Sequence, residues 1–256
     1  MNRKYIRRLA LENLYNVRDL GGFYCQDGSS TRWQSFFRAD NLGQASEKDL
    51  LTLQDFGVKT VIDLRGNFEI AQAPNPTRNH SDFNYYNISL IDEDVTDTSR
   101  KGFDLERFEK MSLGDFYIHM LDKKQDKIRE IFETIYKHQK EGAVLYHCTA
   151  GKDRTGVTSM LLLGLAGVGK ADLVNDYSST DYFLQQNPNR GTHMNYPELS
   201  QEKKEVIKTI MSSKAEYMEK AYLHLLESYG SITGYLSHSG ISDHILEKVR
   251  KGFTEK

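Results

Sequence analysis

The sequence has little cysteine, proline or tryptophan, and it contains no long apolar run. Its two cysteines, Cys25 and Cys148, are too few in 256 residues for the disulfide scaffold of a small secreted domain. No segment approaches the roughly 20 consecutive apolar residues that a membrane-spanning helix needs. We therefore expect a soluble protein of a reducing compartment, the cytoplasm, without stable membrane insertion.

An excess of charge of one sign is also lacking, since 34 Lys and Arg side chains are balanced by 36 Asp and Glu side chains. This balance excludes bulk electrostatic binding, and we expect no nucleic-acid partner. Residues 1–8 are basic, but residues 9–16 are too polar for the apolar core of a signal peptide. Residues 1–15 are expected to form a loosely tied arm. We expect the whole chain, residues 1–256, to form a single domain.

One stretch carries the strongest functional signal. Residues 143–146 have the composition of a buried strand, and residues 157–165 form an apolar stretch typical of a buried helix. In the loop between them, five residues separate Cys148 from Arg154. A strand, a short loop and a helix N-terminus allow successive backbone N–H groups to converge on one anion. Residues 148–154, which we call the phosphate loop, therefore predict a phosphate site that contains a thiol.

Each side chain of this loop suits phosphoryl transfer. A helix N-terminus and neighbouring cations favour the thiolate of a cysteine, which makes Cys148 a candidate nucleophile. The planar fork of Arg154 can bind two phosphoryl oxygens at once. Asp153 is placed to protonate the leaving group, and Thr155 could donate its hydroxyl to the sulfur. Four further residues would line the phosphate with the loop's amides: Thr149, Ala150, Gly151 and Lys152.

The ten residues HCTAGKDRTG, residues 147–156, resemble the Cys-x5-Arg signature of tyrosine phosphatases. They are most similar to the atypical bacterial tyrosine and phosphoinositide phosphatases, which carry a Lys-Asp pair before the arginine. Two further segments resemble that family in the same order along the chain, NVRDLGG at residues 16–22 and VIDLR at residues 61–65.

The resemblance implies a phosphatase that works through a phosphocysteine intermediate without metal or cofactor. Its substrate would be a phosphorylated protein, with phosphotyrosine favoured over phosphoserine and phosphothreonine, or a phosphoinositide. The fold is expected to be α/β, with a mainly parallel central sheet flanked by helices and the phosphate loop at the carboxyl end of a strand. Because the family has secreted members, export without a recognisable signal peptide stays compatible with this interpretation.

The general acid has two candidates. Asp63 and Arg65 follow a predicted buried strand, residues 59–64, and ligands of parallel sheets gather at such carboxyl ends. The sequence contains no Trp-Pro-Asp triplet for a separate acid loop, since its single tryptophan is Trp33. We favour Asp153 over Asp63 on that ground.

Other polar residues of the motifs are expected to support the site. His147 would orient the phosphate loop, or else only pack in the core. Arg18 and Asp19 either form an internal salt bridge or, as the resemblance implies, pack near the phosphate. Lys152 either lies solvated at the rim or adds positive charge for the second phosphate of an inositol ring.

The second half of the sequence is expected to be helical. Residues 185–225 are a candidate helical lid or insertion, with residues 92–121 as the alternative. Cys25 is expected to be an ordinary small side chain, although it could protect Cys148 as a redox partner. The competing function is a binding module that holds phosphotyrosine without cleaving it. An intact Cys, Asp and Arg argue against that alternative, because a binder needs no nucleophile.

Overall fold

The computed structural model describes residues 5–91, 110–188 and 200–256, and a five-stranded sheet lies at its centre. Four of the strands run parallel, whereas the edge strand β1 pairs antiparallel with β3. The α/β class with a mainly parallel central sheet is therefore confirmed. In order across the sheet, the strands are β1 (Arg18–Asp19), β3 (Phe36–Ala39), β6 (Ala143–His147), β4 (Val58–Asp63) and β5 (Asn84–Asn87).

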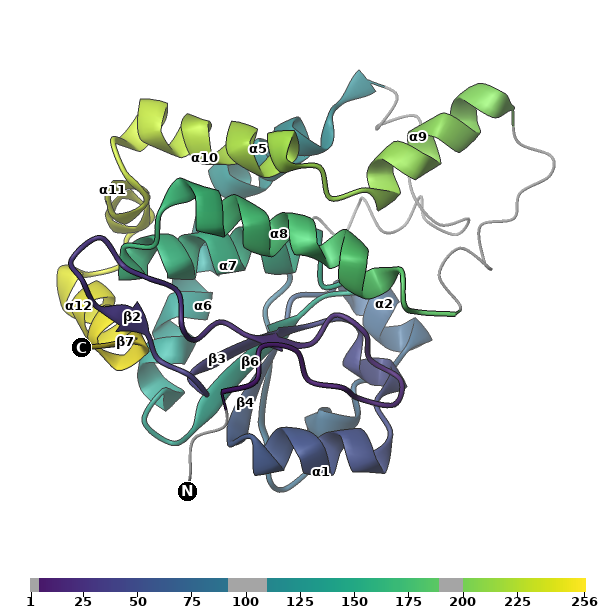
Figure 1. The fold of residues 1–256 in the computed structure, drawn as a ribbon, viewed down its shortest axis with the longest axis horizontal. Coiled ribbons are helices and arrows are strands. Elements are labelled where there is room, and N and C mark those ends of the chain that lie inside the picture. Colours follow the sequence, from purple (N-terminus) through teal and green to yellow (C-terminus); the bar gives the residue numbers. More distant parts are fainter. Residues whose placement is uncertain (1–4, 92–109, 189–199) are drawn as a thin grey trace.

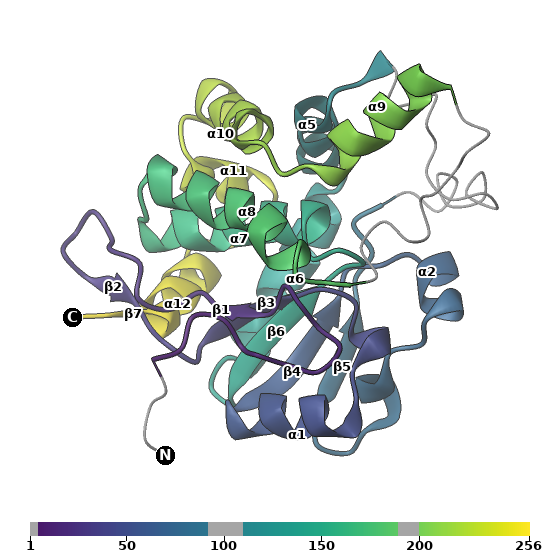
Figure 2. The same cartoon turned by 45° about the vertical axis from the view of Figure 1, so that its right-hand side comes forward.

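Helices cover both faces of this sheet (Figure 1). Helix α1 (Glu47–Asp55) lies on one face, and α7 (Asp153–Ala166) crosses the other. Beyond α7 lies a further layer of helices, which Figure 2 shows from another side. The other main helices are α5 (Leu113–Lys123), α6 (Gln125–His138), α8 (Lys170–Leu184), α10 (Ala215–Tyr229) and α12 (Asp243–Phe253). The remaining elements are β2 (Ser30–Thr31), η1 (Leu42–Gln44), α2 (Asn67–Gln72), η2 (Pro76–Asn79), α9 (Gln201–Met211), α11 (Ile232–His238) and β7 (Thr254–Glu255).

Alternating side chains of the strands divide the core into two clusters. Phe37 and Leu145 join the cluster that contains Leu50 and Leu53 of α1. Their neighbours in the same strands, such as Val144, join the larger cluster beneath α6, α7 and α12. This division follows from the two-residue period of a strand, which points successive side chains to opposite faces. The sheet is buried on both sides, as parallel sheets usually are.

Helix α1 begins and ends where its sequence signals lie. Ser46 caps the helix by accepting a hydrogen bond from the backbone N–H of Asp49, whose carboxylate in turn accepts one from Ser46 N–H. At the other end Gly57 takes the left-handed conformation, with φ of +84°, in which glycine is not strained.

The register of the parallel strands brings their carboxyl ends into one row. Ala39 of β3 is paired with His147 of β6, which is paired with Asp63 of β4, which is paired with Asn87 of β5. The phosphate loop follows His147 directly, so it leaves the sheet at the middle of this row. The fold thus places the ends of β3 and β4 on either side of the loop.

The predicted loose N-terminal arm is wrong for the described residues 5–15. Leu9 and Leu14 are buried in the cluster beside α1, and Leu9 N–H donates to Val17 O at 3.1 Å. Arg8 also pairs with Arg18 of β1 in an isolated bridge. The arm is therefore held against the edge of the sheet by contacts that a short polar segment does not reveal.

Two segments were suggested as a lid, residues 185–225 and residues 92–121. Parts of both, residues 189–199 and residues 92–109, lie outside the described residues. Of the remainder, α10 is packed into the core through Met218, Ala221 and Leu225. In α9, only Ile210 is buried. The position of a lid stays a prediction.

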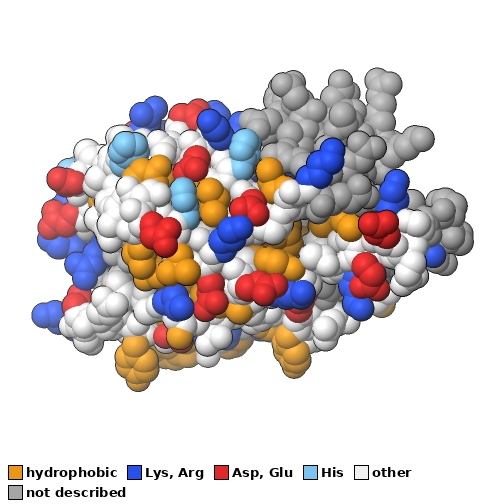
Figure 3. Space-filling model, turned by 90° about the horizontal axis from the view of Figure 1, so that it is seen from above, with side chains coloured by type: hydrophobic (Ala, Val, Ile, Leu, Met, Phe, Trp, Pro, Cys, Tyr) orange, Lys and Arg blue, Asp and Glu red, His pale blue; other side chains and the backbone are white. Residues whose placement is uncertain are grey.

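None of the described helices combines the length and apolar character required to cross a bilayer. On the face seen in Figure 3, acidic and basic side chains are interspersed.

Candidate active site

The phosphate loop connects β6 to the N-terminus of α7. Cys148 follows β6 and is 1 % exposed, and α7 begins at Asp153. Gly151 adopts φ of +65°, and a Cβ at this position would lie 2.4 Å from Ala39 O at the end of β3. Glycine is therefore required twice over, by the backbone conformation and by the close approach of β3.

The carbonyl groups of the loop are held from outside. Asn16 Nδ2 donates to Ala150 O at 2.9 Å and to Gly151 O at 3.0 Å. Arg38 Nη2 also donates to Gly151 O at 2.7 Å. Because the C=O and N–H of one trans peptide group point in opposite directions, these bonds turn the following N–H groups toward the other side of the loop. The loop is thereby prepared to bind an anion.

Arg38 belongs to a buried ion cluster with Asp176 of α8 and Arg18 of β1. Asp176 accepts from Arg18 Nε at 2.8 Å and from Arg38 Nη1. Burial raises the pKa of Asp176, but the two arginines outweigh this effect and bring it to about 2. Two roles were open for Arg18. It forms a salt bridge with Asp176, which also binds Arg38, and Arg38 in turn binds the loop.

Asp19 is separate from that cluster. Its carboxylate accepts hydrogen bonds from Gly21 N–H and Gln34 N–H, each at 2.8 Å. Burial raises the pKa of Asp19 to about 7, against the effect of these bonds. The side chain holds the turn before β3, and the expected Arg18–Asp19 salt bridge is not formed.

Asp63 is saturated with hydrogen bonds beneath the loop. Arg65 binds it through Nε at 2.9 Å and through Nη2 at 2.7 Å. His147 Nε2, Asn75 Nδ2 and Tyr85 Oη lie 3.2–3.4 Å from its Oδ2. Burial raises the pKa of Asp63, but His147 and Arg65 outweigh it and keep the pKa below the ordinary range. A carboxylate held in this state is poorly suited to deliver a proton.

His147 links this cluster to the nucleophile. Its Nδ1 lies 3.0 Å from Cys148 O, and its Nε2 lies 2.8 Å from Asn75 Nδ2. The ring is fully buried. Its contacts hold the backbone of the residue that carries the thiol, and the orienting role expected for it stays a prediction.

Asp153 has a different environment. Tyr117 Oη donates to its Oδ1 at 2.6 Å, and Lys152 Nζ lies 3.3 Å from the same oxygen. The side chain is 21 % exposed, and it stands in the first turn of α7. Asp153 is thus held on one side and accessible on the other, which favours it over Asp63 as the acid.

Arg154 is gripped by a carboxylate that the sequence interpretation missed. Glu69 of α2 accepts from Arg154 Nη1 at 2.5 Å and from Nη2 at 2.8 Å. It also accepts from the hydroxyl of Thr149, the residue after the nucleophile. Burial raises the pKa of Glu69, but Arg154 and Thr149 bring it to about 2. Glu69 therefore ties both ends of the phosphate loop together.

Arg154 interacts electrostatically with the candidate nucleophile Cys148. Burial lowers the pKa of Arg154, but the negative charges of Cys148 and Glu69 outweigh it and raise the pKa above the ordinary value. Glu69 occupies the end formed by Nη1 and Nη2, and no described residue accepts a hydrogen bond from Nε. The side-on fork of Nε and Nη2 is thus the one that can bind phosphoryl oxygens.

Comparison with known proteins identifies the family of the chain. A model of the tyrosine phosphatase family matches residues 9–255. The chain belongs to this family. A tyrosine-protein phosphatase of Nostoc commune is 39 % identical over 154 residues, which are 60 % of this chain and 51 % of that protein, about half its length. The triple specificity protein phosphatase PtpB of Mycobacterium tuberculosis is 24 % identical, with 94 % of this chain and 96 % of that protein covered.

Among solved structures, P. aeruginosa TpbA in complex with phosphotyrosine is similar over 67 % of this chain and 91 % of that chain, with 11 % sequence identity and a TM-score of 0.36. The bacterial tyrosine phosphatase family that the motif predicted is confirmed by the family match.

Two residues of the phosphatase motif depart from the expected roles. Lys152 is 3 % exposed, and its Nζ donates to Ile210 O and, at 3.0 Å, to Ser212 O at the end of α9. It therefore does not lie solvated at the rim, and in this structure its ammonium group is directed toward α9. The hydroxyl of Thr155 is buried and has no hydrogen-bond partner among the described residues, so its expected bond to the sulfur is not formed.

Sequence signals for the missed residues are weak. Glu69 occupies the third position of α2, where its Oε2 accepts from Gly66 N–H at 3.0 Å as an ordinary helix-capping acid would. Tyr117 lies on the buried face of α5, where an aromatic residue indicates core packing. Neither pattern distinguishes a site residue from a structural one.

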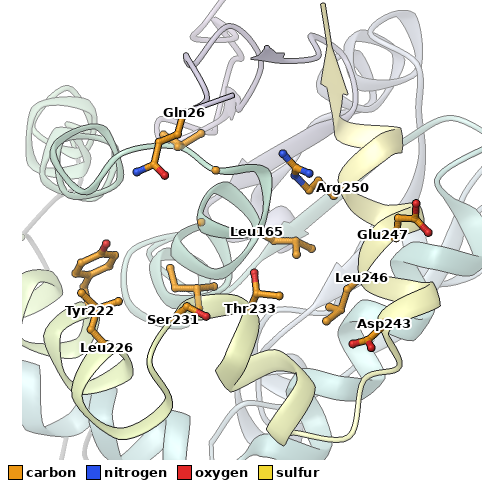
Figure 4. A pocket seen from close by; sticks show the side chains of 14 residues that line it. Gln26, Leu165, Tyr222, Leu226, Ser231, Thr233, Asp243, Leu246, Glu247 and Arg250 are labelled. Carbon is orange, nitrogen blue, oxygen red and sulfur yellow. The ribbon is translucent and has the colours of Figure 1, made fainter. Parts of the chain in front are cut away.

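A pocket with a volume of about 560 Å³ lies at the other end of α7. Figure 4 shows Tyr222 and Leu226 of α10 on one side and Glu247 and Arg250 of α12 on the other. Cys25 is close to this end, since it pairs with Val168 in an isolated bridge.

No group of three or more His, Cys, Asp or Glu side chains in the described part of the chain is arranged to hold a metal ion.

Proposed function

We propose that this protein is a metal-independent phosphomonoesterase, a protein-tyrosine phosphatase that acts through a phosphocysteine. The observation that supports it best is the phosphate loop: a buried thiol and a guanidinium at the N-terminus of α7, with the loop carbonyls held from outside. The network that holds this loop uses the side chains of four separate segments, which a mere βα turn does not require.

In the proposed first step, the Cys148 thiolate attacks phosphorus while the bond to the leaving oxygen breaks. Arg154 and the loop amides stabilise the charge on the three equatorial oxygens. Asp153 gives its proton to the leaving oxygen. In the second step Asp153 takes a proton from a water molecule, which attacks phosphorus, releases inorganic phosphate and restores the thiolate.

The substrate class is part of the proposal. Phosphotyrosine proteins come first, since tyrosine phosphatases are the relatives, and the mycobacterial relative is named a triple specificity phosphatase. Phosphoserine, phosphothreonine and phosphoinositides are the further candidates. A thiolate nucleophile is best preserved in a reducing compartment, so we propose that the protein acts in the cytoplasm.

The test is a panel of phosphotyrosine and phosphoserine peptides and phosphoinositides, compared by kcat/KM from phosphate release. An acid-quenched reaction should show a phosphate adduct on Cys148 by mass spectrometry. We expect turnover to be highest with phosphotyrosine peptides. Binding of those peptides without phosphate release would instead support the alternative, a non-catalytic phosphotyrosine-binding module.

A further inference from the structure

Two buried tyrosines lie behind Asp153. Tyr117 of α5 donates its hydroxyl proton to Asp153 Oδ1 at 2.6 Å, and the hydroxyl of Tyr177 of α8 lies 2.7 Å from that of Tyr117. Both rings are almost completely buried and meet edge to face. Since Tyr117 spends its only proton on Asp153, its oxygen must accept the proton of Tyr177. The chain of hydrogen bonds therefore has one direction, from Tyr177 to Tyr117 to Asp153.

Both tyrosines remain donors under ordinary conditions. Burial raises the pKa of Tyr117 well above its usual value, and the nearby negative charge of Asp153 raises it further. Burial and Asp153 likewise raise the pKa of Tyr177 above the ordinary range. Neither phenol ionises near neutral pH, so each keeps the proton that it donates.

The two oxygens of Asp153 are therefore unequal. Oδ1 accepts a hydrogen bond from Tyr117 Oη and lies 3.3 Å from the ammonium group of Lys152, whereas no described residue donates to Oδ2. An oxygen that already accepts from an O–H and lies beside a cation is a poor place for an acid proton. When Asp153 is protonated, the proton is accordingly held at Oδ2.

We propose that Tyr117 is a positioning residue that selects Oδ2 as the proton-bearing atom of Asp153, a role that rests on the function proposed above. As the sulfur–phosphorus bond forms and the phosphorus–oxygen bond breaks, the proton moves from Oδ2 to the leaving oxygen. The carboxylate that remains is stabilised at Oδ1 by Tyr117 and Lys152. The same arrangement leaves Oδ2 free to take a proton from water in the second step.

The glycine that ends the phosphatase motif fits this role. A Cβ on Gly156 would lie 3.0 Å from Cδ2 of Tyr177 and 3.2 Å from the terminal methyl carbon of Met218. Tyr177 thus packs directly against the first turn of α7. The absence of a side chain at residue 156 allows the tyrosine pair to approach the acid from behind.

The test is Tyr117→Phe, measured with two aryl phosphates that differ in leaving group. Phenyl phosphate needs a proton on its departing oxygen, whereas p-nitrophenyl phosphate needs little help. We expect kcat/KM to fall about tenfold with phenyl phosphate and less than about threefold with p-nitrophenyl phosphate, because a hydrogen bond to a charged group is being lost. In an Asp153→Asn background the same change should add no loss that depends on the leaving group.

Tyr235→Phe provides the matched control. Tyr235 is also buried, and its hydroxyl donates to Leu121 O at 2.7 Å. Leu121 lies one helical turn after Tyr117 in α5. Its removal should not change the ratio of the two kcat/KM values. If Tyr117→Phe does not fold, Tyr177→Phe replaces it, with an expected loss in the same direction of about twofold with phenyl phosphate.

Equal losses of kcat/KM on both substrates would overturn the role of Tyr117. A loss that depends on the leaving group and persists in the Asp153→Asn background would overturn it as well. That result leaves the proposed function standing. A wild-type chain that releases phosphate from neither substrate would refute the proposed function itself, together with the role that depends on it.

Discussion

Helix α7 has a buried cysteine near each end, and the two differ in the groups that surround them. Cys148 is 1 % exposed and precedes the N-terminus, and Cys25 is 7 % exposed and pairs with Val168 just beyond the C-terminus. Fourteen residues of helix, about 20 Å, lie between these ends. A disulfide requires Cα atoms within about 7 Å, so Cys25 cannot serve as a redox partner of Cys148 in this fold.

The difference between the two ends lies in what surrounds each sulfur. At the N-terminus the helix presents free N–H groups. Arg154 is also close enough that the charge of Cys148 raises the pKa of Arg154. At the C-terminus, burial raises the pKa of the Cys25 thiol. The comparison teaches that a helix N-terminus and a nearby cation are the surroundings that favour a reactive thiolate, whereas burial alone disfavours it.

The largest expected effect separates the two cysteines by substitution. Cys148→Ser should reduce turnover of p-nitrophenyl phosphate by at least about a thousandfold, because the nucleophile is lost, while the circular dichroism spectrum stays unchanged. Cys25→Ser is the matched control and should retain kcat/KM within about twofold. If Cys148→Ser kept its activity, the phosphocysteine route would be excluded.

The next effect concerns the two carboxylates near the N-terminus of α7. Asp153→Asn should lower kcat/KM with phenyl phosphate by about a hundredfold, the usual contribution of a general acid, with a smaller loss for p-nitrophenyl phosphate. Asp63→Asn leaves buried Arg65 without its carboxylate partner and should cost about 3–5 kcal/mol of unfolding free energy.

Urea denaturation and the two substrates together distinguish these outcomes. A stable Asp63→Asn variant whose loss grows with the basicity of the leaving group would transfer the acid role to Asp63. The present contacts argue otherwise, since every oxygen of Asp63 is already bound.

The sequence predicted the parts of the site that depend on neighbouring residues. The strand at residues 143–146, the loop with Cys148 and Arg154, and the apolar helix after it all follow from local patterns and spacing. The partners of these residues come from distant segments: Glu69 lies 85 positions before Arg154, and Tyr117 lies 36 positions before Asp153. A single carboxylate or phenol at such a separation leaves no periodic signal. For the same reason the local pairing expected for Arg18 and Asp19 gave way to Asp176, 158 positions away.

A smaller effect tests how Glu69 prepares the reactive end. Glu69→Gln should lower kcat/KM about tenfold, because the amide can accept from Arg154 with only one oxygen and the charge of the pair is lost. If Glu69 positions the guanidinium, inorganic phosphate should inhibit the variant less strongly than the wild type. Stronger inhibition would mean that Glu69 competes with phosphate instead. Glu47→Gln, an exposed change in the first turn of α1, is the control for loss of a helix-capping charge.

The smallest effect is a difference in the pH dependence of alkylation at the two ends of α7. Because burial raises the pKa of Cys25, its thiolate fraction at a given pH is below that of a free cysteine, whose pKa is about 8.5. In the Cys148→Ser variant, iodoacetate should therefore label Cys25 slowly at pH 7 and faster only as the pH rises past 9. In the Cys25→Ser variant, Cys148 should be labelled at neutral pH and protected by inorganic phosphate, since reagent and phosphate compete for the same anion site. Labelling of Cys25 at pH 7 as fast as a free thiol, or its protection by phosphate, would mean that the two ends of α7 do not differ as their surroundings imply.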